Sequence, residues 1–369
     1  MTNAVLAPGD VAHDSEAAAK AAGLRFTNLG RPGITREPAK AGWRYRGPDG
    51  KVLRDQKQID RINALVLPPA WTEVWINTDP RGHIQATGRD ARGRKQYRYH
   101  DKWRATRDEA KFARLAAFGR ALPTIRRRVA ADLRKTGFPK QKVEATVVRL
   151  LDESLIRIGN EEYARENASF GLTTLQNDHV DVEGAKLRFH FRGKSGKEHE
   201  VDVRDRRVAT IVRKLQDLPG QHLFQYQDED GELRQITSDS VNEYLQEVTG
   251  EPFTAKDFRT WAGTVLTCQL LRDTGPTETE RERNANIVSA IDAAAARLGN
   301  TRAVCRSSYI YPAILQRYAE GTWPAPAETA PEAPQVPLLD ECECLLLAYL
   351  EQDAAECARH PPEPGITPA

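Results

Sequence analysis

The stretch from Arg297 to Tyr318 reads Arg-Leu-Gly-Asn-Thr-Arg-Ala-Val-Cys-Arg-Ser-Ser-Tyr-Ile-Tyr-Pro-Ala-Ile-Leu-Gln-Arg-Tyr. A helical pattern runs into it, the Gly299-Asn300-Thr301 step breaks that pattern, and a second helical pattern follows. Tyr309 lies between the two. A phenol with a pKa of about 10 is a poor nucleophile at neutral pH unless cations surround it. Tyr309 is therefore either a packing residue or a nucleophile in a cationic site, and the rest of the chain must decide.

Charge is unevenly distributed along the 369 residues. The whole chain carries +2, but nine acidic residues and one basic residue give the segment from Thr322 to Ala369 a charge of −8, which leaves +10 for the remainder. A basic body suits a polyanionic partner, although a solvated surface would show the same charges. No apolar run approaches the ~20 residues of a membrane span, and five cysteines without a secretory signal predict a reduced, cytosolic protein.

Patterning predicts an α+β protein with two lobes and two tails. We expect a disordered or weakly helical leader at 1–23, a β-rich domain at 24–105, a mainly α-helical domain with a β-hairpin at 106–321, and an acidic, Pro-rich tail at 322–369 that contains one amphipathic helical stretch. In the first domain we expect a hairpin with a turn at 47–50, a helix at 55–65 capped by Asp55, and strands at 71–77 and 83–87. In the second we expect helices at 108–121, 125–135 and 142–167, separated at Pro123 and at 137–139.

The most basic stretch, Gly88 to His100, alternates cations with aromatic residues: Arg94, Lys95, Gln96, Tyr97, Arg98 and Tyr99. In a strand, Tyr97 and Tyr99 share one face and Arg98 points the other way. Gln96 is able to read a base edge, while arginine and lysine hold phosphates. The alternative is an exposed hairpin with a solvated basic loop.

Three further cations stand in motif-like settings. Arg157, between two isoleucines of the helix expected at 142–167, either reaches out to solvent or pairs with a buried anion. Lys194 lies at the tip of a hairpin whose first strand alternates apolar and cationic residues, and it is either a solvated turn residue or a mobile catalytic group. Arg259 is expected in the first turn of a helix, beside free backbone N–H groups that favour phosphate.

Neither a metal site nor a nucleotide-binding loop is predicted. Cys342, Cys344, Cys357 and His360 have zinc-ligand chemistry, but a helix over 344–357 would separate its ends by ~20 Å. The chain also lacks a Gly-rich loop of the Walker type, so ATP is not indicated.

Taken together in order, the local motifs resemble the type IB DNA topoisomerases, in particular the small bacterial and poxvirus-like group. The similarity spans roughly residues 24–320, and no single motif carries it. The motifs are Pro68-Pro69-Ala70-Trp71, Arg94-Lys95-Gln96-Tyr97-Arg98-Tyr99-His100, Leu155-Ile156-Arg157-Ile158-Gly159-Asn160 with Tyr163, Gly171-Leu172-Thr173-Thr174-Leu175, Phe191-Arg192-Gly193-Lys194-Ser195-Gly196-Lys197, Lys256-Asp257-Phe258-Arg259-Thr260 and Gly299-Asn300-Thr301 through Ser308-Tyr309.

The resemblance implies a monomeric enzyme that closes on duplex DNA like a clamp, with a DNA-binding first domain and a catalytic second one. Tyr309 would attack a phosphodiester and become linked to the 3′-phosphate, Arg157 and Arg259 would hold the non-bridging oxygens, and Lys194 would act as general acid. Rotation of the free strand would relax supercoils without ATP or metal, in the cytoplasm at the nucleoid. The resemblance also places Tyr163 and the residues 94–99 at the DNA.

One position departs from the family pattern. Many members carry histidine where this chain has Asn300, and an asparagine amide donates a hydrogen bond but cannot carry charge. We therefore expect Asn300 to contact an oxyanion; either the family histidine is mainly a donor, or this enzyme is slower.

Two alternatives stay open. A tyrosine recombinase shares the catalytic set but normally shows His-x-x-Arg, where this chain has Lys256-Asp257-Phe258-Arg259, and its first domain is helical. A non-catalytic DNA-binding protein would use the same basic surface without the tyrosine.

Overall fold

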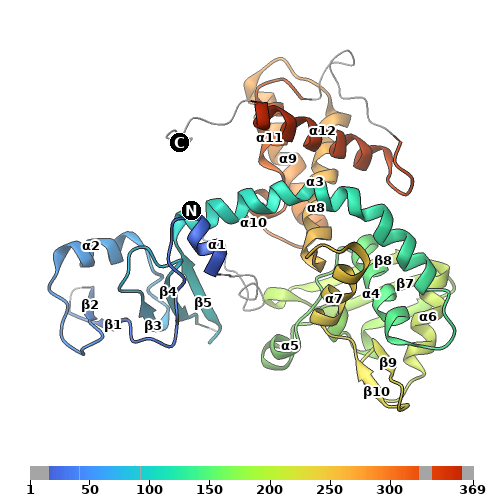
Figure 1. Cartoon of the computed structure of the whole chain (residues 1–369), viewed down its shortest axis with the longest axis horizontal. Coiled ribbons are helices and arrows are strands. Elements are labelled where there is room, and N and C mark those ends of the chain that lie inside the picture. Colours follow the sequence, from blue (N-terminus) through green and yellow to red (C-terminus); the bar gives the residue numbers. More distant parts are fainter. Residues whose placement is uncertain (1–15, 41, 92, 324–334, 360–369) are drawn as a thin grey trace. The chain divides into compact units, whose positions relative to one another are not determined.

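The computed structural model describes residues 16–40, 42–91, 93–323 and 335–359 (Figure 1). The chain divides into two compact units, residues 1–111 and 112–369. Within the described residues, every helix is too short or too polar to cross a membrane.

The first unit is built on a five-stranded antiparallel sheet with the strand order β2-β1-β3-β4-β5. Its core contains Ile34, Val74, Ile76 and Ala86 from the sheet, packed with Ile62 of α2. The elements are α1 (Glu16–Ala21), β1 (Ile34–Pro38), β2 (Trp43–Arg46), α2 (Gln56–Ala64), β3 (Thr72–Ile76), β4 (Ile84–Arg89) and β5 (Lys95–Tyr99). The β-rich character predicted for this region is confirmed.

Two local expectations in this unit are confirmed and one is modified. Asp55 caps α2 by accepting hydrogen bonds from the amides of Lys57 and Gln58. The turn at 47–50 also forms, with the Gly50 amide donating to the Gly47 carbonyl at 2.9 Å. The return strand, however, is reduced to a single bridge, and β2 pairs along its length with β1, which the sequence pattern did not reveal.

Part of the leader is helical, which is one of the two expected alternatives. Residues 16–21 form α1, where Ala19 is fully buried and packs with Leu24 and Trp103. The alanine-rich sequence by itself does not predict this contact, because Trp103 is distant in the chain. Residues 1–15 lie outside the described residues.

The second unit is mainly helical and carries two small antiparallel sheets, of order β6-β7-β8 and β10-β9. One large apolar core runs through it. Its helices are α3 (Asp101–Asp132, which begins in the first unit), α4 (Lys140–Ser154), α5 (Glu161–Asn167), α6 (Arg206–Gln216), α7 (Ser238–Thr249), α8 (Ala255–Thr274), α9 (Glu280–Leu298), α10 (Arg302–Ser308), α11 (Pro312–Ala319) and α12 (Glu341–Arg359). Its strands are β6 (Val180–Glu183), β7 (Lys186–Arg192), β8 (Glu198–Arg204), β9 (Gln225–Gln227) and β10 (Leu233–Gln235).

The helix boundaries differ from the pattern in two places. Pro123 lies inside α3 rather than ending a helix, because the fully buried neighbours Leu122 and Ile125 fix this turn in the core. The helix expected over 142–167 is interrupted at 155–160: Leu155 takes a left-handed conformation with φ 59°, and Asn160 caps a new helix, α5. Residues Leu172–Thr174 form a 3₁₀ turn between α5 and β6.

The C-terminal segment differs most from the expected tail. The amphipathic helix forms as α12, but it packs onto the second unit, with Leu346, Leu347, Tyr349 and Leu350 buried in the main core. Figure 1 shows α12 in red beside α11. An acidic composition suggested solvent exposure, whereas the acidic residues of this helix include ion-pair partners of α3 arginines.

Candidate active site

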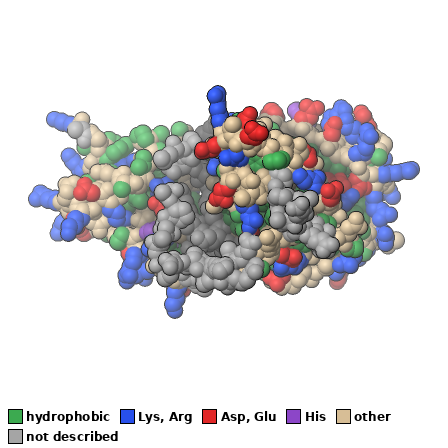
Figure 2. All heavy atoms as spheres, turned by 90° about the horizontal axis from the view of Figure 1, so that it is seen from above, with side chains coloured by type: hydrophobic (Ala, Val, Ile, Leu, Met, Phe, Trp, Pro, Cys, Tyr) green, Lys and Arg blue, Asp and Glu red, His purple; other side chains and the backbone are tan. Residues whose placement is uncertain are grey.

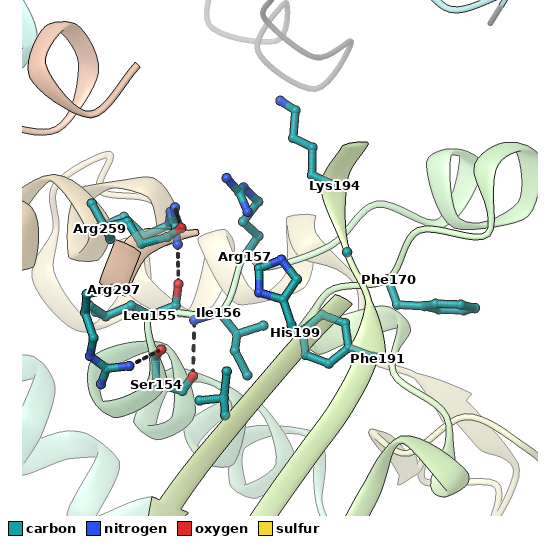
Figure 3. Close-up of a pocket in the computed structure, with 13 residues that line it drawn as sticks. Ser154, Leu155, Ile156, Arg157, Phe170, Phe191, Lys194, His199, Arg259 and Arg297 are labelled. Carbon is teal, nitrogen blue, oxygen red and sulfur yellow. Dashed lines mark hydrogen bonds between the residues drawn. The ribbon is translucent and has the colours of Figure 1, made fainter. Parts of the chain in front are cut away.

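Four of the five predicted catalytic residues contact one another in the second unit: Arg157, Arg259, Asn300 and Tyr309 meet where α4, α8, α9 and α10 end or begin. The fifth, Lys194, lines a pocket together with Arg157 and Arg259, from the β7–β8 hairpin (Figure 3). The residues are far apart in sequence, so the site exists only because the core brings these helix ends together.

Arg259 projects from α8, which begins with a capping box between Thr254 and Asp257. Its guanidinium donates hydrogen bonds to the carbonyls of Leu155 and Leu298, the second at 2.7 Å. These carbonyls end α4 and α9, where helix dipoles place partial negative charge. The expectation that Arg259 lies beside free N–H groups in the first turn is therefore wrong: it lies one turn further in and is fixed by the C-terminal ends of two other helices.

Arg157 lies in the turn after α4 rather than on a helix. The amide of Leu172 donates to the Arg157 carbonyl at 2.9 Å, and the amide of Thr173 donates to the next carbonyl at 2.7 Å. With its backbone so fixed, the guanidinium donates to the Gly299 carbonyl at 3.4 Å and to Asn300 Oδ1. Its interaction with the end of α9 is thus of the same kind as that of Arg259.

The site leaves both arginines without a carboxylate partner among the described residues. Arg259 is only 4% exposed. Burial, together with the nearby charge of Arg259, lowers the pKa of Arg157 to about 10, against a smaller opposing effect of Tyr309. Arg157 therefore remains charged at neutral pH, and both guanidinium groups face the site without a carboxylate to neutralise them.

Tyr309 ends α10 and packs on α8. The Thr264 hydroxyl donates to the Tyr309 carbonyl at 3.2 Å, and a Cβ on Gly263 would lie 2.7 Å from that oxygen, so only glycine permits this contact. The Arg259 guanidinium lies 5.1 Å from the centre of the Tyr309 ring. Burial raises the pKa of the phenol, but the charges of Arg259, Lys256 and Arg157 and a hydrogen bond from Arg259 outweigh it and lower the pKa to about 8.

Two buried donors at the site lack an acceptor among the described residues: Asn300 Nδ2 and Arg259 Nε. Because Asn300 Oδ1 accepts from Arg157, the amide nitrogen is the atom left over. A buried donor without an acceptor is costly, and an oxyanion supplied by a ligand would satisfy it.

Lys194 lies in the short 3₁₀ turn at the tip of the β7–β8 hairpin, as predicted. Leu187, Phe189 and Phe191 of β7 are buried while the alternating basic residues face outward, which confirms the two-sided strand. In Figure 3 the lysine extends beyond the Arg157 guanidinium, at the rim of the pocket.

One pocket residue, His199, was not assigned to the site from the sequence. It stands near the start of β8 and lines the pocket with Arg157 and Lys194. A histidine between two glutamates in a strand matches no catalytic motif. What could have indicated it is the hairpin register, in which His199 pairs with Phe191 close to the Gly193-Lys194 tip.

The predicted DNA-contacting residues of the first unit differ in accessibility. Lys95 is exposed and its amine lies 5.6 Å from the Tyr97 ring centre, while Tyr97 stacks on Tyr99 at 6.1 Å. Gln96 and Tyr99 are each 2% exposed. The remaining members are Arg94, which pairs with Asp90 at 2.6 Å, and the half-buried Arg98.

Tyr163, expected at the DNA, belongs to α5 in the second unit, where it is half-buried.

The surface seen in Figure 2 shows Lys and Arg side chains with Asp and Glu side chains interspersed, so this surface carries both positive and negative charge.

Comparison with known proteins gives matches over both units. A family model for the catalytic core of eukaryotic DNA topoisomerase I matches residues 100–322, and one for the N-terminal domain of bacterial DNA topoisomerase IB matches residues 42–90. The chain is 34% identical over 293 residues to DNA topoisomerase 1B of Acanthamoeba polyphaga mimivirus. The match covers 78% of this chain and 87% of the viral protein.

Two other relatives match over a shorter part of the chain. DNA topoisomerase 1B of Vaccinia virus (strain Copenhagen) is 28% identical over 183 residues, or 48% of this chain and 56% of that protein. DNA topoisomerase 1 of Mycosarcoma maydis is 24% identical over 218 residues, or 51% of this chain and 21% of that protein. The helix α12 lies outside both matched family models.

Proposed function

The chain belongs to the type IB DNA topoisomerase family, and on this premise we propose that Tyr309 is the nucleophile with which this DNA topoisomerase cuts one strand of a duplex. The Tyr309 oxygen forms a bond to phosphorus, the bond from phosphorus to the 5′-oxygen breaks, and the protein becomes linked to the 3′-phosphate. The covalent link keeps the energy of the phosphodiester, so the reverse attack by the 5′-hydroxyl rejoins the strand without ATP.

Arg157 and Arg259 stabilise the transition state in this proposal. A phosphodiester carries one negative charge and its pentacoordinate transition state about two, so fixed cations bind the transition state more strongly than the substrate. Their planar forks match non-bridging phosphate oxygens, and Asn300 Nδ2 adds a neutral donor. This charge takes the place that a divalent cation occupies in many phosphoryl-transfer sites, so we expect cleavage to proceed in EDTA.

Lys194 is proposed as the general acid that protonates the departing 5′-oxygen. Its place at a hairpin tip allows the side chain to reach a bound strand, because a short turn moves more freely than the helices that hold the arginines. Once the 5′ end is released, torsional stress drives rotation of the free strand and supercoils relax.

One observation carries the proposal: Arg259, Lys256 and Arg157 lower the pKa of Tyr309 to about 8, and neither arginine has a carboxylate partner among the described residues. An ordinary packing tyrosine has neither the cations nor the lowered pKa. The same unit offers the contrast of Tyr244, where burial and the adjacent Asp132 raise the pKa of the phenol.

We further propose that Lys95 and Tyr97 contact DNA phosphates and sugars directly and that Tyr163 adds a contact from the second unit. Gln96, Tyr99, Arg94 and Arg98 then shape this surface or reach DNA after rearrangement. The enzyme would act as a monomer on chromosomal DNA in the cytoplasm. Contacts that are mainly to phosphate predict binding that weakens steeply with salt.

The test is relaxation of supercoiled plasmid in EDTA without ATP. The wild-type enzyme is expected to relax the plasmid, and Tyr309→Phe to bind DNA but neither relax it nor form a covalent adduct. The matched control is Tyr311→Phe: Tyr311 is two residues away and packs on Phe112 with 5.6 Å between ring centres, so its loss should leave relaxation intact.

Two outcomes would overturn the proposal. A covalent adduct in Tyr309→Phe would mean that another residue is the nucleophile, and recombination between sites without relaxation would favour a recombinase.

A further inference from the structure

His199 occupies a slot between the two segments that carry Lys194 and Asn300. Its ring stacks on that of Phe191, directly opposite in the β7–β8 register, with centres 5.2 Å apart and planes 11° from parallel. In Figure 3 the imidazole lies between the Phe191 ring and the Arg157 side chain.

Two glycines make room for this ring. A Cβ on Gly193, the residue before Lys194, would lie 2.5 Å from His199 Cδ2, and a Cβ on Gly299, the residue before Asn300, would lie 2.7 Å from His199 Cε1. Contacts this short do not exist between real side chains, so the imidazole touches both backbones. Gly299 additionally needs its left-handed φ of 62° to end α9.

The two contacts join parts of the site that come from different elements, the hairpin tip and the turn at the end of α9. The hairpin tip is closed on itself, by the Gly193 amide donating to the Lys197 carbonyl at 2.8 Å. The Gly299 carbonyl belongs to the other side of the site, where it accepts from Arg157. The His199 ring is therefore the spacer that sets the distance from the lysine-bearing tip to the Arg157–Asn300 pair.

The charges around the ring keep it neutral. Burial and the charges of Arg157, Arg259 and Lys197 lower the pKa of His199, with Glu198 opposing them weakly. Neither ring nitrogen has a hydrogen-bonding partner in the described part of the chain. A neutral side chain packed by its faces and carbon atoms contributes shape rather than charge.

We propose that His199 is a positioning residue for DNA cleavage, whose imidazole seats the Lys194 hairpin against the Gly299–Asn300 turn so that the lysine reaches the departing 5′-oxygen. This rests on the general-acid role proposed for Lys194. Loss of the ring would leave the arginines and Tyr309 in place but let the lysine drift, which predicts a defect in leaving-group protonation alone.

A substrate with sulfur in place of the scissile bridging 5′-oxygen isolates that step. A thiol ionises with a pKa of about 8.5, so it departs without a proton. On a duplex with a mapped cleavage site, we expect His199→Ala to slow single-turnover cleavage of the oxygen substrate by about 10- to 100-fold and to cleave the sulfur substrate within about twofold of wild type. A variant that is merely less stable would not recover on sulfur.

Two further variants sharpen the test. Gly193→Ala keeps the histidine but displaces it from the other side, and should show the same loss on oxygen and recovery on sulfur. His190→Ala removes an exposed histidine of the adjacent strand β7 and should match wild type on both substrates.

The outcomes separate this inference from the general-acid assignment. Lys194→Ala should lose about 10²- to 10⁴-fold on oxygen and recover on sulfur; without that recovery, both the general-acid role and the inference for His199 fail. If Lys194→Ala recovers but His199→Ala is equally slow on both substrates, or normal on both, only the positioning role of His199 is overturned.

Discussion

Arg126 and Arg259 are arginines of the same unit, each mostly enclosed by protein, and their surroundings are opposite. Arg126 on α3 donates to both Asp152 oxygens at 2.8 and 3.0 Å and to both Glu343 oxygens at 2.7 and 2.9 Å. Arg259 and its neighbour Arg157 donate to backbone carbonyls and an amide oxygen and face the Tyr309 phenol, and neither has a carboxylate partner among the described residues.

The two kinds of surroundings have opposite effects on the charge of the arginine, and we assign the first to fold stability and the second to catalysis. The carboxylates raise the pKa of Arg126 above its ordinary value despite burial, whereas burial and Arg259 lower that of Arg157 to about 10. Carboxylate partners cancel the charge of Arg126, so this residue cannot attract an anionic ligand. The carbonyls at helix ends carry only partial negative charge, so Arg157 and Arg259 retain a net positive charge that can bind a phosphate.

The largest effect should come from changing one of the two active-site arginines, Arg157 and Arg259, which have no carboxylate partner among the described residues. Arg259→Lys replaces a planar fork by a point charge that cannot hold two carbonyls and a phosphate at once. We expect single-turnover cleavage to fall by about 100- to 1,000-fold while DNA binding persists. Arg126→Lys is the control, and cleavage by the folded protein should stay within about threefold of wild type. An equal loss of cleavage in both variants would contradict the distinction between arginines with and without carboxylate partners.

Substitutions in the cluster of Arg126, Asp152 and Glu343 should instead lower the stability of the fold. Glu343 also accepts from the Trp261 indole at 3.0 Å, so it joins α12 to α3 and α8. Glu343→Gln removes one of the two charges facing Arg126 and should lower the free energy of unfolding in urea by about 2–3 kcal/mol. On the same helix, Glu351 pairs with Arg120 in an exposed position, and Glu351→Gln should cost less than about 1 kcal/mol.

A pH profile tests the charge that remains at the active site. The phenolate of Tyr309 is the attacking form and its pKa is about 8, so the cleavage rate should rise about tenfold per pH unit up to that value and then level off. Removing one of the cations with Lys256→Gln should move the inflection to higher pH, and a profile that is flat from pH 6 to 9 would contradict the assignment.

The smallest effect is expected for the substitution Asn300→His. Histidine placed there supplies a donor in the same role, so Asn300→His should change the cleavage rate by less than about threefold, whereas Asn300→Leu should cost about 10- to 100-fold by leaving the oxyanion without this contact. A large gain in Asn300→His would show that the enzyme lacks a proton-transfer group.

Sequence patterns predicted those parts of the site that depend on neighbours along the chain. Alternation over 187–192 places Lys194 at a hairpin tip, and the Gly299-Asn300-Thr301 break places Tyr309 after a helix end. The site residues themselves were selected by the family resemblance, because nothing local distinguishes Arg157 from an arginine that reaches for solvent.

The remaining features depend on contacts between distant segments. The left-handed Leu155 ends α4 early and turns its carbonyl toward Arg259, more than a hundred residues further along the chain. The burial of α12 needs the Arg126 cluster, and the slot of His199 needs two glycines from different elements. No periodicity in a single segment contains this information.

The most direct test of the central claim is to trap the covalent complex on a DNA substrate that cannot be rejoined, digest the protein, and identify the modified residue by mass spectrometry. The account predicts a single adduct, on Tyr309, linked through a 3′-phosphate. An adduct on Tyr311 or Ser308, or a link to a 5′-phosphate, would contradict it.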